Sequence, residues 1–363
     1  MDKNEKALLW LDNFDFATYS KKAKLLKLVS NASDFLQWEM VVKIRDKIEK
    51  ILTPEESQIF FRQVGEDFAD QIIEKLNSLN ISATTIESVD YPKSLRNIDT
   101  PPFVLYYKGN PKLMREDCFG IVGTRHITSY GKMATEKFCH GLVDAGYVIV
   151  SGLASGVDTC AHQNALNFHG QTIAVLAGGI DEIYPATNTA LAGKIVESGG
   201  LVLSEVRPLR RAESYMFPIR NRIIAGLSSG ILVVEAGEKS GALHTKNYAL
   251  DYGKDVFAVP GSVFSIASLG TNRMISNGQA KAVCDIRDII GDRKLRPIAL
   301  KTSSENVSLE ENVVLELLKS GEKTFQELVD LSHIETKRLN SLLTMLAIRG
   351  IIKKLAGNVY FLK

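Results

Sequence analysis

An arginine-rich stretch in the middle of the chain carries the clearest chemical signal in this sequence. Five arginines lie within sixteen residues, and Tyr215 and Phe217 are interleaved with them. Guanidinium groups neutralise phosphates and aromatic faces stack on bases, so this combination favours sequence-tolerant binding of single-stranded nucleic acid. The alternative is a solvated basic loop in which Phe217 packs at the start of a helix. The five arginines are Arg207, Arg210, Arg211, Arg220 and Arg222.

Three glycine-containing segments, residues 120–131, 151–158 and 177–181, follow expected strands. Glycine at a strand end lets backbone N–H groups approach a phosphate, and the N-terminus of the next helix adds partial positive charge. Arg125 in the first segment adds a full charge on a bidentate fork. The alternative is that any doubly wound domain needs glycines at its tight turns. Three such segments, one of them with Arg125, favour an anion site.

The common nucleotide motifs are missing from these segments. No GxxxxGK[ST] sequence occurs in the chain and no loop reads GxGxxG, so neither a P-loop nor a dinucleotide cofactor is expected. Glu205 and Glu235 stand at expected strand ends, where a catalytic acid, a helix cap and an ion pair with arginine are all open possibilities. His162 and His244 are expected to pack or hydrogen-bond rather than act as bases.

Composition indicates a soluble globular protein of two or three domains. The 363 residues have a net charge of +2, which excludes a histone-like coating of nucleic acid. Four scattered cysteines form no CxxC pair, so we expect reduced thiols, no metal site and no cofactor. No apolar stretch reaches about 18 residues and the N-terminus is charged. We therefore expect no membrane span, no signal peptide and a cytoplasmic location.

Residues 117–290 alternate between short apolar strands and helices. The strands show no clean polar alternation, as expected for strands buried on both faces. This pattern predicts a doubly wound parallel sheet with helices on both sides and ligands at the carboxyl ends of the strands. The predicted strands are 119–122, 147–150, 172–176, 201–204, 231–235 and 256–259, and the predicted helices are 131–145, 157–168, 187–198, 219–228 and 241–252.

The N-terminal part of the chain has a different pattern. Residues 1–80 read as a helical domain, in which one apolar helix face runs through residues 54–78. Thr53-Pro54 supplies an N-cap and a proline at the first helical position. Residues 81–116 read as a connector that leads into the α/β domain and contains a short strand at 103–107.

The C-terminal part follows a polar linker at residues 291–308. Residues 309–363 predict three helices and a hairpin that turns over Gly357-Asn358, which together make a winged helix. Regulation through duplex DNA binding by this part is an alternative function. Its third predicted helix carries the basic residues Lys337, Arg338 and Arg349.

A series of short motifs runs in a specific order along residues 90–285. They occupy residues 120–125, 151–158, 161–162, 184–185, 204–205, 217–228, 234–236, 240–242, 259–261 and 270–272. Together they resemble the DNA-processing protein A family, also called the Smf family. The segment 217–228, Phe-Pro-Ile-Arg-Asn-Arg-Ile-Ile-Ala-Gly-Leu-Ser, is close to diagnostic of that family by itself.

The resemblance implies an extended Rossmann fold that binds and protects single-stranded DNA, with no catalytic residues. It also implies loading of the RecA recombinase during natural transformation, a homodimer formed through the Rossmann domain, and a sterile-alpha-motif-like N-terminal domain. By motif position, Arg125 is the main phosphate contact and Phe217 the base-stacking group, with Arg220 and Arg222 in the same pocket. The expected DNA-binding residues are Gly123, Thr124, Arg125, Ser151, Gly152, Arg210, Arg211, Phe217, Arg220, Asn221, Arg222 and Lys239.

Two positions depart from the family pattern. Ser214 stands where a basic residue can occur, a charge that Arg210 and Arg211 can supply from upstream, and His244 replaces an isoleucine. The remaining alternative is an enzyme like the cytokinin-activating phosphoribohydrolases, whose related Rossmann domain uses an Arg/Glu pair. The PGGxGT-type loop of those enzymes is absent, because residues 234–241 read Val-Glu-Ala-Gly-Glu-Lys-Ser-Gly.

Overall fold

The structure is a computed structural model that describes residues 1–293, 309–348, 351–355 and 358–362. The chain divides into two compact units, Met1–Pro297 and Ile298–Lys363. Most of the linker predicted at 291–308 lies outside the described residues. In the described parts, no helix is both long and apolar enough to cross a membrane.

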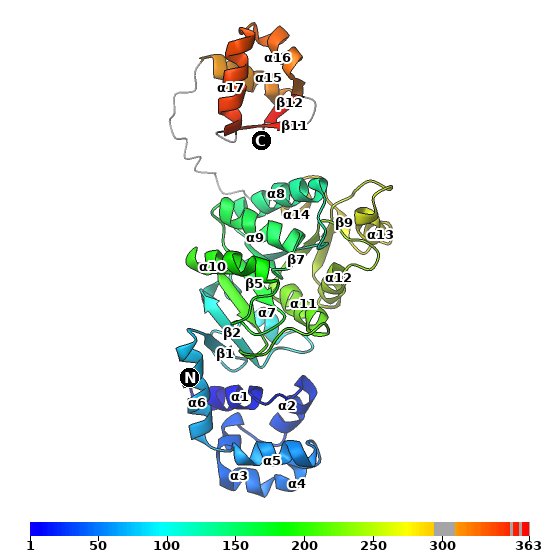
Figure 1. Cartoon of the computed structure of the whole chain (residues 1–363). Helices are drawn as coiled ribbons and strands as arrows, with labels where there is room; N and C mark the ends of the chain where they lie inside the picture. Colours follow the sequence, from blue (N-terminus) through cyan, green and yellow to red (C-terminus); the bar gives the residue numbers. More distant parts are fainter. Residues whose placement is uncertain (294–308, 349–350, 356–357, 363) are drawn as a thin grey trace. The chain divides into compact units, whose positions relative to one another are not determined.

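A large sheet forms the centre of the first unit (Figure 1). Within the described residues nine strands pair in the order β1-β2-β6-β5-β4-β3-β7-β8-β9. All neighbouring pairs from β6 to β9 are parallel, which confirms the predicted doubly wound sheet. The strands are β1 Ser82–Thr85, β2 Val104–Gly109, β3 Cys118–Val122, β4 Val148–Ser151, β5 Thr172–Leu176, β6 Leu201–Ser204, β7 Gly230–Val233, β8 Asp255–Ala258 and β9 Lys281–Ala282.

Two antiparallel strands extend the sheet beyond β6, a feature that the βαβα pattern does not predict. β2 lies antiparallel to β6, with Tyr106 opposite Ser204, and β1 lies antiparallel to β2. β2 begins one residue after the start of the strand predicted in the connector. Because the connector contributes two strands, it is part of the sheet.

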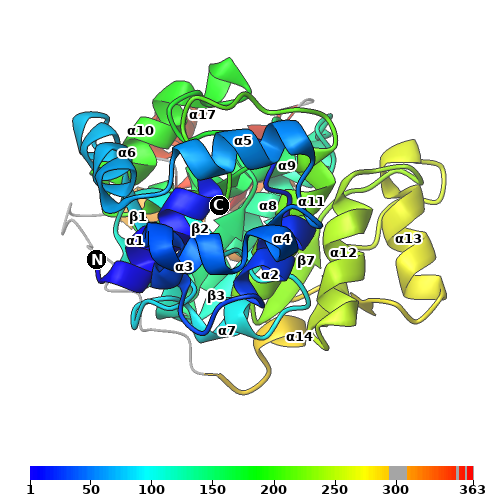
Figure 2. The same cartoon turned by 90° about the horizontal axis from the view of Figure 1, so that it is seen from below.

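Helices cover both faces of the sheet. Phe119 and Ile121 of β3 pack with α8 and α9, whereas Cys118 and Val122 of the same strand pack with α11 and α12 on the opposite face. Each central strand is thus buried on both sides, which explains its uninterrupted apolar sequence. In two views α12 and α13 lie together at the β8 side of the unit (Figures 1 and 2). The helices are α7 Lys93–Arg96, α8 Ser129–Asp144, α9 Val157–Asn167, α10 Thr189–Glu197, α11 Met216–Leu227, α12 Ala242–Asp251, α13 Leu269–Ser276 and α14 Arg287–Ile290, with 3-10 helices η2 Pro111–Arg115, η3 Ala186–Asn188 and η4 Ile266–Ser268.

An aromatic cluster holds the N-terminal helices together. Trp10 meets Phe14 and Phe60 edge-on, with ring centroids 4.9 and 5.0 Å apart, and stacks on Phe35 at 6.4 Å. The prediction of one helix across 54–78 is wrong, because the chain breaks at Gly65, whose φ of +146° is strained for any other residue. The helices are α1 Lys3–Asp12, α2 Tyr19–Leu26, η1 Ala32–Leu36, α3 Trp38–Lys43, α4 Arg45–Ile48, α5 Pro54–Arg62 and α6 Glu66–Ser78.

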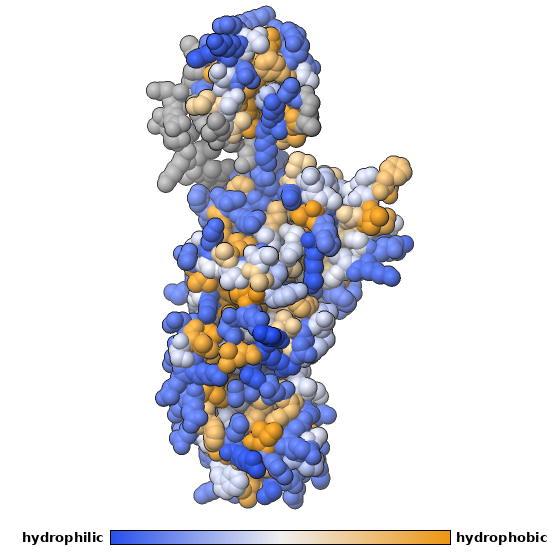
Figure 3. Space-filling model, in the orientation of Figure 1, coloured by the Kyte–Doolittle hydropathy of each residue, from blue (hydrophilic) through white to orange (hydrophobic). Residues whose placement is uncertain are grey.

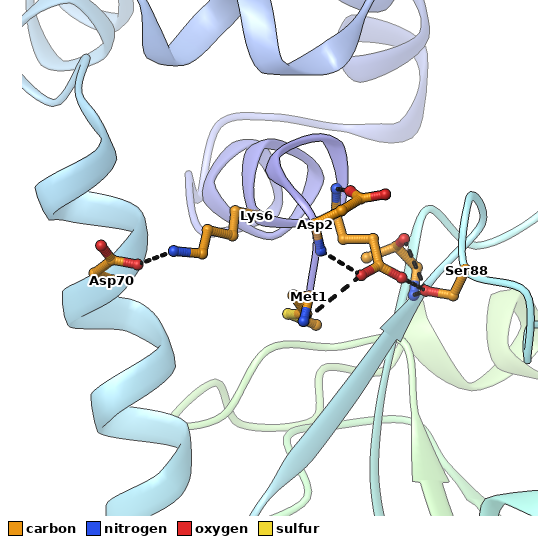
Figure 4. A network of polar contacts seen from close by, with 7 residues as sticks. Met1, Asp2, Lys6, Asp70 and Ser88 are labelled. Carbon is orange, nitrogen blue, oxygen red and sulfur yellow. Dashed lines mark hydrogen bonds and ion pairs between the residues drawn. The ribbon is translucent and has the colours of Figure 1, made fainter.

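Polar contacts fasten these helices to the edge of the sheet. The Glu5 carboxylate accepts hydrogen bonds from the Asp2 amide at 2.9 Å and from the hydroxyl of Ser88, which lies just after β1 (Figure 4). Further along α1, the Asp12 carboxylate accepts from the buried hydroxyl of Tyr106 on β2 at 2.8 Å. The helices and the sheet therefore share one packed interface.

The second unit contains helices and a small antiparallel sheet with the order β10-β12-β11 among its described residues. These are the elements that a winged helix requires, and that assignment stays a prediction. Arg338 forms an ion pair with Glu310 at 2.8 Å, while Arg349 and Gly357 lie outside the described residues. The elements are α15 Leu309–Lys319, β10 Lys323–Thr324, α16 Phe325–Ser332, α17 Thr336–Ile348, β11 Ile352–Leu355 and β12 Val359–Leu362.

Candidate functional site

A groove opens where the carboxyl ends of β3 and β7 lie side by side. From β3 the chain leads through α8 to β4 on one side, whereas from β7 it leads through α12 to β8 on the other. Doubly wound sheets bind ligands at such switch points. The groove has a volume of about 840 Å³ and is lined by the loops that follow β3, β4 and β7 and by the first turns of α11 and α12.

Arg125 and Phe217 meet inside this groove. The Arg125 guanidinium carbon lies 5.2 Å from the centroid of the Phe217 ring, within cation–π range. Tyr184 contacts the same ring edge-on, with centroids 5.6 Å apart. Arg125 and Tyr184 are exposed and Phe217 is half-buried. A charged fork from the loop after β3 and a flat ring from the first turn of α11 are thus both presented to the groove.

Further polar residues of the groove come from α11 and from the loop between β7 and α12. Lys239 is exposed on the groove wall, and Asn221 donates to the carbonyl of Gly241 at 3.3 Å, which ties α11 to α12. The acidic Glu238 is ion-paired with Arg273 at 2.8 Å. The exposed cations Arg125 and Lys239 therefore give the groove a positive character, which suits a polyanion.

Arg220 lies beneath the groove and not on its open surface. Its Nη1 donates to the carbonyl of Gly152 at 2.7 Å and to that of Val175, and burial lowers its pKa to about 10. Asp158, also buried, is the nearest opposite charge and acts to raise that pKa. The hydrogen bonds of Arg220 join α11 to the ends of β4 and β5, and its side chain contributes to the groove lining from below. Its expected contact with DNA stays a prediction.

Arg220→Ala is expected to lower the free energy of unfolding by about 3 kcal/mol, because it removes the hydrogen bonds to the Gly152 and Val175 carbonyls and the positive charge that favours the buried Asp158 carboxylate. Urea denaturation followed by circular dichroism measures this change. Arg211→Ala is the matched control: its side chain is 84% exposed and pairs with Glu182 at 3.1 Å, so we expect a loss below about 1 kcal/mol. An unchanged urea midpoint in the Arg220 variant would contradict the structural role.

Other predicted contact residues also lie away from the groove. Arg222 pairs with Glu205 at 2.5 Å and lines a separate cavity of about 270 Å³ between the sheet and the N-terminal helices. It diverges from Arg220 because residues two apart project from different faces of a helix. Arg210 donates to the hydroxyl of Tyr215 at 2.9 Å. Arg207, which is not among the predicted contacts, pairs with Asp15 of the N-terminal part at 2.5 Å.

Backbone amides of the glycine loops already have partners inside the protein. The Thr124 amide donates to the carbonyl of Glu235 at 2.8 Å, and the Gly152 amide donates to the Asp158 carboxylate at 3.2 Å. Ser151 is buried, and its hydroxyl donates to a main-chain carbonyl of β3. The Thr124 and Gly152 amides are thus already used inside the protein, and a phosphate cradle formed by other amides of these loops stays a prediction.

The N-terminus of α8 is occupied as well. The buried carboxylate of Glu235 accepts from the amide of Thr128 at 3.0 Å and from its hydroxyl at 2.5 Å, so it takes the place that an anion would have. Gly131 leaves room for this carboxylate, since a Cβ there would lie 2.2 Å from Oε2. Of the roles open to Glu235, the structure shows a helix cap. Glu205 is the ion-pair partner of Arg222.

Two glycines have their own packing reasons. A Cβ on Gly123 would lie 2.5 Å from Cγ2 of Val157, so glycine is needed where α9 approaches the end of β3. A Cβ on Gly152 would lie 2.4 Å from Nη2 of Arg220. Both glycines therefore permit close packing around the groove floor.

Groove residues absent from the sequence prediction include Tyr184, His126 and Ser240. Tyr184-Pro185 is among the recognised motifs, and an exposed aromatic residue after the Gly178-Gly179 turn is a signal for a ligand contact. His162, in contrast, is fully buried, with Nδ1 2.7 Å from the Thr172 hydroxyl, and burial lowers its pKa to about 3. It is therefore a neutral packing residue, as expected.

The fold and the site together define a Rossmann-like, doubly wound protein with a cationic, aromatic-lined groove at its switch point. The family model described as DNA recombination-mediator protein A matches residues 82–294. The chain belongs to this family.

Two relatives align with more than half of this chain. The DNA processing protein DprA of Bacillus subtilis is 40% identical over 246 residues, which span 68% of this chain and 80% of that protein. DprA of Streptococcus pneumoniae is 43% identical over 202 residues, 56% of this chain and 71% of that protein.

Two solved structures resemble this one. The X-ray structure of DprA from S. pneumoniae superposes with a TM-score of 0.68 at 33% identity, covering 81% of this chain and 99% of that one. The structure of DNA processing protein A from Helicobacter pylori superposes with a TM-score of 0.53 at 33% identity. The match covers 58% of this chain and 95% of that one, and that work concerns the single-stranded DNA binding mode of the H. pylori protein.

Proposed function

We propose that this protein binds single-stranded DNA along the groove between β3 and β7. Arg125 contacts a phosphate and Phe217 stacks on a base, while Lys239 neutralises a second phosphate. The observation that carries this proposal is the Arg125–Phe217 pair, whose guanidinium and ring lie 5.2 Å apart on the groove surface. Stacking on an aromatic ring tolerates any base, so the half-buried Phe217 ring suits an unpaired strand of any sequence. The single-stranded DNA binding of the H. pylori relative supports the same ligand.

The contacts of Glu235 and Glu205 favour a binding role over nucleotide hydrolysis. A phosphoribohydrolase requires a glutamate free to act beside an arginine. Here Glu235 caps α8 through Thr128, and Glu205 is ion-paired with Arg222 outside the groove. Neither of these two glutamates is therefore free to act as the catalytic acid, which favours a strand-binding role over hydrolysis.

The bound strand and the family together suggest the protein's partners. We propose that the bound strand is protected and then passed to the RecA recombinase during natural transformation, in the cytoplasm, by a homodimer formed through the α/β domain. The family's description as a recombination mediator supports transfer to a recombinase.

Fluorescence anisotropy with a labelled oligo-dT strand tests the central proposal. We expect tight binding whose affinity falls steeply as salt is raised, because phosphate contacts release counterions. Incubation with AMP in parallel should release no free adenine. Absence of oligo-dT binding at low ionic strength, or release of adenine from AMP, contradicts the proposal.

A further inference from the structure

An apolar loop between β8 and α13 borders the groove. Val263, Phe264 and Ile266 in this loop are 73%, 95% and 78% exposed, values that large apolar side chains rarely show. Ile266 and the nearby Leu269 also line the groove itself. Apolar surface is visible beside α13, at the right of the first unit (Figures 1 and 3). The loop is thus continuous with the proposed binding surface.

The base of the loop is held in one conformation. The side-chain amide of Asn272 accepts from the Gly261 amide at 3.1 Å and donates to the Gly261 carbonyl at 3.0 Å. The Tyr130 hydroxyl donates to the carbonyl of Pro260 at 2.6 Å, and the Gly270 amide donates to the carbonyl of Ala236 after β7. These hydrogen bonds between the motifs at 259–261 and 270–272 and their neighbours hold both ends of the loop. The apolar side chains between the two motifs are therefore exposed on a loop whose ends are fixed.

We propose that Phe264 is a second stacking platform for the same unpaired strand after the strand leaves Phe217. This inference rests on the proposed function. Lys239 is exposed on the groove wall, so a cation is available there for an intervening phosphate, whereas Arg273 on α13 is ion-paired with Glu238. Strand binding that alternates aromatic faces with cations is the usual way to hold bases without reading them.

The composition of the loop favours a strand over a second copy of this chain. Ser262 and Ser265 interrupt the run of exposed apolar side chains, and the Ser262 hydroxyl accepts from the Phe264 amide at 3.3 Å. Interfaces between protein copies have a contiguous apolar core. Phe264 is the one aromatic ring among Val263, Phe264 and Ile266, and an exposed ring beside hydroxyl groups matches a wet nucleic-acid contact better.

Binding of oligo-dT strands of increasing length, from 6 to 24 nucleotides, distinguishes the contribution of Phe264 from that of Phe217. Phe264→Ala is expected to leave the affinity for the shortest strand unchanged and to weaken binding of the longest by about tenfold, since one stacked base is lost. The length at which the loss appears gives the number of nucleotides between the rings. Phe264→Tyr should restore binding of the long strand. Trp38→Ala, which removes a 54% exposed ring from α3, is the matched control and should change nothing.

A strand with 2-aminopurine at single positions provides a direct readout of stacking. We expect Phe217→Ala and Phe264→Ala to relieve quenching at different positions. Equal losses for short and long strands, no loss at any length, or a shift from dimer to monomer in Phe264→Ala by light scattering would each overturn the inference. If the wild-type protein binds no strand, the proposed function itself fails. If Arg125→Ala loses binding while Phe264→Ala does not, only the second platform fails.

Discussion

Arg125→Ala is expected to weaken binding of an oligo-dT strand by about 10- to 100-fold. The change removes a charge-assisted contact to phosphate, worth about 1.5–3 kcal/mol, and takes the guanidinium away from the Phe217 ring. One fewer neutralised phosphate should also reduce the slope of log affinity against log salt by about 0.7, the value for single strands. Anisotropy titrations at four salt concentrations measure both quantities.

Two controls separate this effect from unfolding and from charge alone. Arg125 is exposed, so the urea midpoint of the alanine variant should match the wild type. Arg125→Lys keeps the charge but lacks the planar fork, so its salt slope should recover while its affinity stays intermediate. If the alanine variant kept both wild-type affinity and wild-type slope, Arg125 would have no part in the site.

Phe217→Ala is expected to weaken binding by about 5- to 150-fold, which corresponds to the roughly 1–3 kcal/mol of one stacked base. The salt slope should stay at the wild-type value, because no phosphate contact is lost. The same titrations therefore distinguish the ring from the arginine by their salt dependence.

A double variant measures how far the two groups act together. Because the Arg125 guanidinium lies over the Phe217 ring, we expect the combined loss to be smaller than the sum of the separate losses by at least about 0.5 kcal/mol. Phe217→Trp should retain most of the affinity. Strict additivity, or a changed slope in the single Phe217 variant, would argue against a shared site.

The framework of the α/β domain could be predicted from the sequence because its central strands are buried on both faces. Uninterrupted apolar runs such as 172–176 coincide with the observed strand β5. The position of the groove at the strand ends could also be predicted. Arg125 follows a glycine-containing turn after a strand, and Phe217 stands directly before Pro218 at the start of a helix. Helix α11 begins at Met216, before its predicted start at 219, because Pro218 fits within a first turn.

The fate of each arginine could not be predicted, because composition does not reveal which cations face solvent. Arg220 and Arg222 are two residues apart, yet one supports the groove floor and the other pairs with Glu205 in a different cavity. Likewise, glycine loops indicated accessible amides, but the sequence does not show that Glu235 and Asp158 would satisfy amides of these loops from elsewhere in the fold. Long-range pairing of this kind requires the tertiary structure.

The contact between Arg125 and Phe217 has a consequence for the cost of association. Both side chains are already held against each other before any ligand arrives, and Tyr184 supports the ring from its edge. Few rotamers remain to be frozen when a nucleotide docks, so less conformational entropy is lost at that step. Such preorganisation lets a small contact area retain a flexible polymer that would otherwise dissociate quickly.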